Sequence, residues 1–225
     1  VTLIANVAVH PDYRQRGIGR ALTARALEVI RDRGNRAAWL QVREENEAAI
    51  ALYRSLGFEE RTRRTAWELT PERCKTQAGI DGEVGGLTGR DWPAARDWLE
   101  ALYPPLVAWN LPFAADPLRP GWWAGLQRAV NGQSVRHWSL RRGGRLAGAL
   151  IWEPSRLSAD ILWPAAPEAQ LAGTLAAILP VACAELGSGR PLMVNLPVWL
   201  EATALSGMGF KLQNTLIWME KPNLR

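Results

Sequence analysis

The sequence predicts an α/β (α+β) protein in which strands alternate with helices. Two observations support this class. A β-branched and apolar stretch, residues 3–9, leads through a glycine-rich turn into a segment with helical periodicity. The same alternation of apolar strands and periodic helices returns in the second half of the chain. With 225 residues, 48% of them hydrophobic, the chain can bury a sizeable core in one large or two modest domains.

The first part of the chain has the predicted order β-α-β-α-β-β. The predicted strands are residues 3–9 and 37–42, followed by two strands near residues 58–63 and 64–69. The predicted helices are residues 20–33, which Gly34 ends, and residues 46–56, which Gly57 ends.

A domain boundary is expected between residues 70 and 90. Residues 71–83 lack helical or strand periodicity and collect glycine, proline, threonine and charged residues, which predicts a linker between a domain at 1–70 and another at 84–225. The second domain has predicted helices at 90–109, 120–130, 170–186 and near 199–206. Its predicted strands are a hairpin at 136–152 that turns at Gly143 and Gly144, and segments 158–163 and 191–197.

Composition narrows the class of partner. The net charge is +5 and comes mostly from arginine. Clustered cations bind the phosphates of nucleic acids. Here acidic residues are interspersed and no basic run alternates with aromatic side chains, which favours a solvated surface and argues against nucleic acid. A smaller anionic partner stays open.

Cysteine usage and hydropathy indicate a cytoplasmic protein. Cys74 and Cys183 are far apart and lack metal-ligand or CxxC spacing, so we interpret them as two reduced thiols and expect no metal site. The apolar stretch 171–186 is interrupted by Pro180 and Glu185 and is too short to span a bilayer, which predicts a buried helix and no membrane partner. The N-terminal residues show no signal-peptide pattern.

The turn after the first strand has the chemistry of a diphosphate cradle. Arg14-x-x-Gly17-x-Gly19 stands where the helix begins. Glycines remove the Cβ atoms that would hold a ligand away, and they permit the positive φ angles that turn successive N–H groups inward. The helix N-terminus adds partial positive charge, and Arg14 and Arg16 add full charges. On its own this pattern is not specific, because it occurs about as often in a tight strand-to-helix connection that binds no ligand.

A second element at the right distance makes the pattern specific. The stretch "NEAAIALYRSLGF" places Asn46, Ala49, Leu52 and Tyr53 on successive turns of one helix. Together with "VAVHPDYRQRGIGRAL" and the strand "WLQV", it resembles the GNAT superfamily, the Gcn5-related N-acetyltransferases, across residues 3–69. The resemblance implies the GNAT fold, a central mixed sheet flanked by helices, with acetyl-CoA as acyl donor.

The resemblance also implies where acetyl-CoA lies. The diphosphate would bind the turn and the start of the helix, and the pantetheine arm would pair with the strand edge between splayed strands. Asn46 would form a hydrogen bond with the cofactor. The cofactor-binding residues implied in this way are Val7, Ala8, Val9, Arg14, Gln15, Arg16, Gly17, Ile18, Gly19, Arg20 and Asn46.

By the same resemblance, residues 1–70 correspond to the C-terminal half of a GNAT domain, and we expect residues before Val1 to supply the other half. Residues 84–225 are expected to be a divergent second copy in a tandem arrangement. Its phosphate turn would be Gln170-x-x-Gly173-x-Leu175, in which leucine replaces the second glycine. We therefore expect that this copy does not bind acetyl-CoA and contributes packing.

Acyl transfer needs a neutral amine, donors for the oxyanion and a proton for the leaving thiolate. The amide near Val7 would be the oxyanion donor, and Tyr53 is the candidate general acid; the alternative for Tyr53 is a packed side chain bonded to backbone. No general base is evident, because Ala5 and Gln41 stand where the family often has a carboxylate. A water relay or a base from outside this segment would serve equally.

The predicted function is an acetyl-CoA-dependent N-acetyltransferase that acts on a primary amine by direct attack in a ternary complex. The acceptor could be a small molecule or a peptide, and a homodimer stays open. The alternative is a non-catalytic acyl-CoA-binding or scaffolding protein that has kept the cradle and lost the base.

Overall fold

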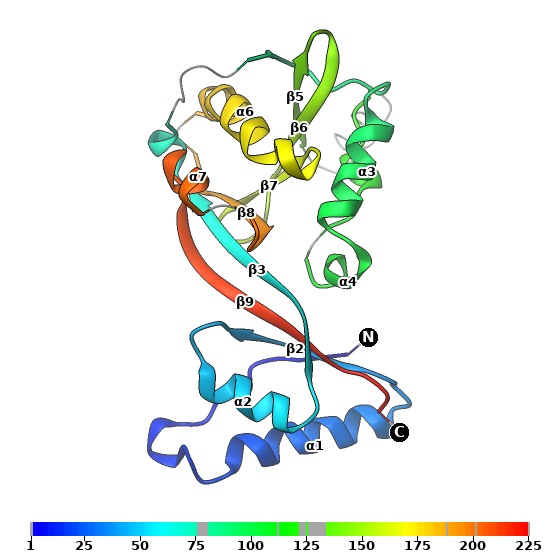
Figure 1. The fold of residues 1–225 in the computed structure, drawn as a ribbon, viewed down its shortest axis with the longest axis vertical. Helices are drawn as coiled ribbons and strands as arrows, with labels where there is room; N and C mark the ends of the chain where they lie inside the picture. The colour runs from blue at the N-terminus through cyan, green and yellow to red at the C-terminus, as the bar shows by residue number, and fades with distance from the viewer. Residues whose placement is uncertain are drawn as a thin grey trace. The chain divides into compact units, whose positions relative to one another are not determined.

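The computed structural model describes residues 2–75, 81–111, 113–121, 125, 134–187, 189–200 and 202–224. The chain forms two compact units, one of Val1–Thr65 with Asn214–Arg225 and one of Ala66–Gln213 (Figure 1). The prediction assigned all of residues 84–225 to the second domain. The last twelve or so residues group with the first unit, because strand β9 (Lys211–Lys221) pairs antiparallel with β2 (Ala38–Arg43) from Leu216 to Lys221.

The first unit places its helices against a mixed sheet. Strand β1 (Thr2–Ile4) runs parallel to β2, β9 runs antiparallel to β2, and β3 (Glu59–Leu69) lies beside β9. Helix α1 (Ile18–Asp32) follows the 3-10 turn η1 (Pro11–Tyr13), and α2 (Glu47–Ser55) follows β2. Both helices pack on one face of the strands. Their shared core contains Ile4, Leu27, Ile30, Ala38, Leu40, Val42, Ile50, Tyr53, Phe58, Ile217 and Met219.

Two predictions for this unit are wrong. The first strand was expected at 3–9 but pairs with β2 only over Thr2–Ile4, since Asn6 takes a left-handed φ of 59° that interrupts the ladder. Residues 59–69 form one strand, because neither glycine nor proline divides the two halves expected. The neighbour of β3 in the sheet is β9, from the far end of the chain.

The second unit is built on a larger part of the sheet. Its strand order is β3, β8 (Leu192–Pro197), β7 (Asp160–Ala165), β6 (Arg145–Glu153), β5 (Arg136–Arg142) and β4 (Glu83–Gly85). The predicted hairpin between β5 and β6 is confirmed. Gly143 and Gly144 both have positive φ, 53° and 75°, as a tight two-residue turn requires.

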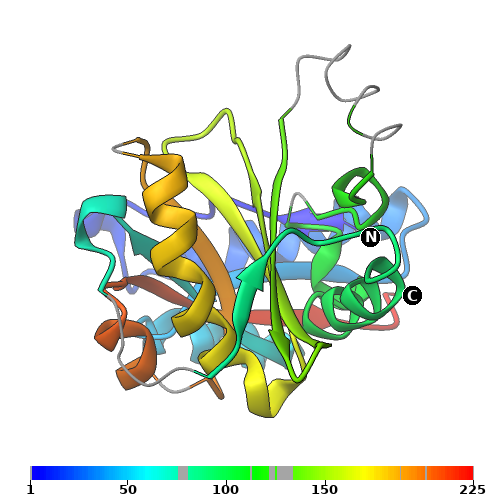
Figure 2. The same ribbon diagram turned by 90° about the horizontal axis from the view of Figure 1, so that it is seen from above.

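Helices α6 (Leu171–Leu186) and α3 (Trp92–Leu102) cover opposite faces of strands β5 to β7 (Figures 1 and 2). The helix expected at 90–109 is interrupted after Leu102, and α4 (Pro105–Ala108) begins after Pro104, which cannot continue α3. Shorter elements are η2 (Pro71–Arg73), η3 (Asp116–Leu118), η4 (Glu168–Gln170) and α7 (Ala202–Gly207). The helix predicted at 120–130 falls largely outside the described residues.

Helix α6 is the core helix of this unit, as its apolar sequence predicts. Its buried side chains include Leu171, Leu175, Ile178 and Leu179. Among the described residues, the stretch Glu168–Leu186 is the one helical segment long and apolar enough to cross a bilayer by composition, with a mean hydropathy of 1.5. Its buried side chains agree with a core helix, which can be as long and as apolar as a membrane-spanning one.

Candidate functional site

The turn before α1 holds a row of backbone donors open. Gln15 and Gly17 both adopt left-handed conformations, with φ of 60° and 78°, and Gly17 is the N-cap of α1. The amide of Ala21 is the first to bond back into the helix, to the Gly17 carbonyl at 3.0 Å. No described residue accepts a hydrogen bond from the amides of residues 15–20. These donors and the helix dipole together favour an anion.

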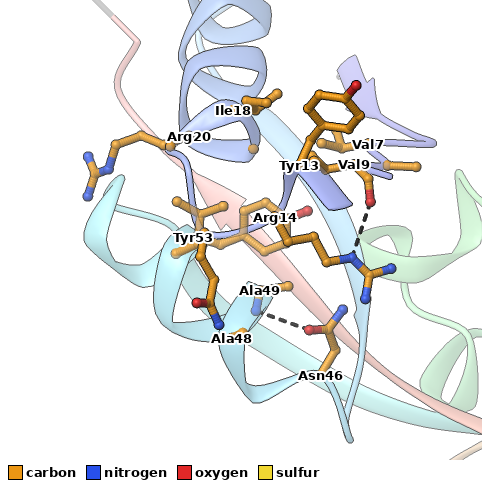
Figure 3. A pocket seen from close by; sticks show the side chains of 15 residues that line it. Val7, Val9, Tyr13, Arg14, Ile18, Arg20, Asn46, Ala48, Ala49 and Tyr53 are labelled. Carbon is orange, nitrogen blue, oxygen red and sulfur yellow. Dashed lines mark hydrogen bonds between the residues drawn. The ribbon is translucent and has the colours of Figure 1, made fainter. Parts of the chain in front are cut away.

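A cavity of about 760 Å³ opens directly on this turn (Figure 3). It lies between the turn, the start of α1, the extended residues after β1 and one face of α2. All the predicted site residues except Arg16 line it. The lining residues are Val7, Ala8, Val9, Tyr13, Arg14, Gln15, Gly17, Ile18, Gly19, Arg20, Asn46, Ala48, Ala49, Leu52 and Tyr53.

The three arginines of the turn point in different directions. Arg14 reaches across the cavity and donates from Nε to the Val9 carbonyl at 3.2 Å, which leaves its guanidinium nitrogens near Asn46 (Figure 3). Arg20 donates to Ser55 Oγ at 2.6 Å. The Arg16 guanidinium stands over the Tyr13 ring, 5.4 Å from its centre, and so contributes to the site through Tyr13.

The residues after β1 offer a free edge along the cavity. Since Asn6 breaks the ladder, no described residue bonds to the amides of Val7, Ala8 and Val9. An extended ligand with alternating donors and acceptors can pair with such an edge.

A second cavity, of about 350 Å³, lies where β1 and β2 diverge. Its lining includes Ala5, Asn6, Gln41, Arg43 and Leu216. Both cavities are lined by Val7, Asn46, Ala49 and Tyr53. The two cavities therefore share a wall that includes Tyr53.

Tyr53 itself is buried, with 8% of its surface exposed, and packs edge-to-face against Phe58 at 5.9 Å. Burial raises the pKa of its phenol above the ordinary value, so the hydroxyl stays protonated at neutral pH. No described residue forms a hydrogen bond with this hydroxyl. Tyr53 is thus packed, as the alternative expected, but no described residue supplies the backbone hydrogen bond that the alternative also expected.

Asn46 also has a structural task, at the start of the helix where the sequence places it. It is the N-cap of α2, and its Oδ1 accepts a hydrogen bond from the Ala49 amide at 3.1 Å. Its side-chain NH₂ group remains available to a ligand, because capping uses only the oxygen. Tyr13 and Ala48 were missed from sequence, although Tyr13 lies inside the quoted turn.

Three other titratable residues that lie near the site in the sequence, Glu44, Glu45 and His10, line neither cavity. Glu44 pairs with Arg63 at 2.6 Å and Glu45 with Arg43 at 3.5 Å, as solvated surface residues do. His10 accepts from the Asp12 amide in the loop. Among the described residues lining the second cavity there is no carboxylate.

The second unit has no comparable turn at the place expected. Gly173 and Leu175 lie inside α6, so the prediction of a turn there is wrong, and Leu175 is fully buried in the core. The residues that precede α6 have right-handed or extended conformations, with φ of −53° at Pro167 and −108° at Gln170. They do not form the left-handed pair that opens the amides in the first unit.

Comparison with known proteins agrees with this geometry. Residues 1–58 match the family model of the Acetyltransferase (GNAT) family. This segment is therefore similar to GNAT acetyltransferases. The chain is 49% identical over 69 residues to the [ribosomal protein bS18]-alanine N-acetyltransferase of Escherichia coli K12, a match that covers 30% of this chain and 47% of that protein. The mycothiol acetyltransferase of Thermobifida fusca is 55% identical over 53 residues, 16% of its length.

The match therefore spans about half the length of the bS18-alanine enzyme and a smaller share of the mycothiol acetyltransferase. Solved structures cover almost all of it. A GCN5-related N-acetyltransferase from Sphaerobacter thermophilus matches 96% of this chain and 71% of its own with a TM-score of 0.59 at 14% identity. A tandem GNAT protein from the clavulanic acid biosynthesis pathway matches 98% and 74%, with a TM-score of 0.55 at 17% identity. At this identity the likeness shows the fold, which is the GNAT fold.

Proposed function

We propose that this protein is an acetyl-CoA-dependent N-acetyltransferase, in which a primary amine attacks the donor directly within a ternary complex. The observation that carries the proposal is the meeting of two cavities at Tyr53, one with an open row of amides and one between diverging strands. A donor and an acceptor can then approach the same hydroxyl from two sides.

The donor cavity suits acetyl-CoA. Its open amides, from Gln15 to Arg20, would hold the diphosphate, and the guanidinium groups of Arg14 and Arg20 add positive charge at its edge. The amides of Val7, Ala8 and Val9, to which no described residue bonds, would pair with the pantetheine arm. The volume of about 760 Å³ is that of a typical small-molecule site.

In the acyl transfer, the amine nitrogen bonds to the thioester carbon and the carbon–sulfur bond breaks. The Val7 amide would donate to the carbonyl oxygen as it gains negative charge. Tyr53, which its raised pKa keeps protonated, would give its proton to the departing sulfur. The amine must lose a proton, and with Gln41 and Ala5 in the acceptor cavity we assign this step to a water relay or to a group outside the described residues.

The acceptor is an amine of a small molecule or a peptide. The names of the relatives are compatible with both, since one is named for an alanine of a ribosomal protein and another for the small molecule mycothiol. We also propose that the chain acts in the cytoplasm, that its two units form a tandem pair, and that the second unit does not bind acetyl-CoA.

The test is release of free thiol from acetyl-CoA by the purified protein against a panel of amines. Amine-dependent release that Tyr53→Phe reduces supports the proposal. Saturable acetyl-CoA binding without release for any amine would contradict catalysis and favour the alternative, a non-catalytic acyl-CoA-binding protein. The observation that favours this alternative is Gln41, which stands where the family often has a carboxylate.

A further inference from the structure

Two cysteines that the sequence separates widely come together in the second unit. Cys74 is the C-cap of η2, and Cys183 lies inside α6, on which η2 packs. Both line one small cavity of about 240 Å³, together with Glu72 and Pro180. Both belong to the hydrophobic packing of this unit, and both are free thiols.

The two thiols affect each other's protonation across the cavity that they share. A hydrogen bond between their side chains lowers the pKa of the Cys74 thiol and raises that of the Cys183 thiol, which burial raises further. Cys183 is 7% exposed, whereas Cys74 is only partly buried. Both residues line the cavity, and Cys74 is the more exposed of the two, which makes it the first candidate for attack on a solute.

We propose that Cys74 and Cys183 are a redox-active pair, which a low-molecular-weight disulfide of the glutathione class oxidises to an intramolecular disulfide. This inference does not depend on the proposed acetyltransferase function, because neither cysteine lines the cavities at Tyr53.

The reaction balances in two exchanges. The Cys74 thiolate attacks one sulfur of glutathione disulfide, and the reagent's sulfur–sulfur bond breaks to release one glutathione thiolate. Cys183 then loses its proton to solvent and attacks Cys74 Sγ, which expels the second glutathione. Two protein thiols are oxidised by two electrons, and one glutathione disulfide is reduced to two glutathione molecules. The new bond would join η2 to α6.

Convergence of the thiols in the folded chain predicts a high effective concentration. In the unfolded chain, two thiols so far apart meet at an effective concentration in the millimolar range or lower. We expect the equilibrium constant for disulfide formation, measured in glutathione buffers, to be at least roughly a hundredfold larger in the folded chain than in urea.

The experiment equilibrates the 225-residue chain with mixtures of reduced and oxidised glutathione, with and without urea, and traps the thiols by alkylation. Peptide mapping by mass spectrometry should identify one Cys74–Cys183 peptide that has lost two hydrogens, in a monomeric chain. Cys183→Ala, which keeps the reachable thiol, should stop at a mixed disulfide on Cys74.

Three results would overturn the inference. The first is a folded chain that is no more oxidised than the unfolded chain in the same buffer. The second is a mixed disulfide on wild-type Cys74 that persists without conversion to the internal bond. The third is a disulfide that links two chains. Because the wild-type comparison needs no variant, the test holds even if Cys183→Ala fails to fold.

Discussion

Replacement of Gly19 by alanine should strengthen the fold and weaken ligand binding at the same time. A Cβ at position 19 would lie 3.4 Å from Leu52 Cδ2 and 3.9 Å from Val9 Cγ2, ordinary contacts that require no rearrangement. Alanine in place of glycine within a helix stabilises by roughly 0.5–1 kcal/mol. We therefore expect Gly19→Ala to raise the free energy of unfolding slightly.

The same methyl group would stand in the donor cavity, between two of its lining residues. A diphosphate kept away from the amides at this point would lose one hydrogen bond to a charged group, worth about 1.5–3 kcal/mol. The dissociation constant for acetyl-CoA should then rise by about tenfold to a hundredfold. Calorimetric titration measures this constant, and urea unfolding measures the stability of the same sample.

Gly17→Ala is the matched control. Gly17 has a φ of 78° and no atom within 4 Å of an added Cβ, so alanine there meets backbone strain and no steric contact. That strain costs about 1–2 kcal/mol of stability. A stable Gly19→Ala protein that binds acetyl-CoA as tightly as wild type would refute the cradle assignment.

Three further predictions concern the hydroxyl of Tyr53, its protonation and the packing of Gly148. Tyr53→Phe should lower kcat by roughly tenfold to a thousandfold with little change in the KM for acetyl-CoA, and a wild-type kcat would assign Tyr53 to packing. Because its pKa is raised, Tyr53 stays protonated as pH increases, so kcat should show no Tyr53-dependent fall between pH 7 and about pH 10 in a pH-rate profile. Gly148→Ala should destabilise by about 1–3 kcal/mol in urea unfolding, because its Cβ would overlap Thr174 on α6; unchanged stability would show that α6 can move away.

The local parts of the donor site could be predicted from sequence, because each depends on neighbouring residues. The turn from Arg14 to Gly19, the helix that Asn46 opens and the hairpin at Gly143 and Gly144 follow from glycine placement, capping residues and periodicity. The residues carried over from the family resemblance, apart from Arg16, then fall around one cavity.

The parts that failed depend on contacts between distant segments. Nothing local to residues 211–221 indicates that this strand pairs with β2, since β9 carries the pattern of any half-buried strand. The early end of β1 depends on one left-handed asparagine, a conformation that asparagine adopts only in some contexts. The shared cavity of Cys74 and Cys183 likewise requires η2 to pack on α6.

The central claim is that the amides of the turn before α1 hold the diphosphate of acetyl-CoA. An amide NMR titration of the 225-residue chain with acetyl-CoA tests it most directly. The account predicts the largest shifts at the amides of residues 15–20, saturation at one ligand per chain, and none comparable at residues 168–173. Saturable shifts at the start of α6, or shifts that bypass residues 15–20, would contradict it.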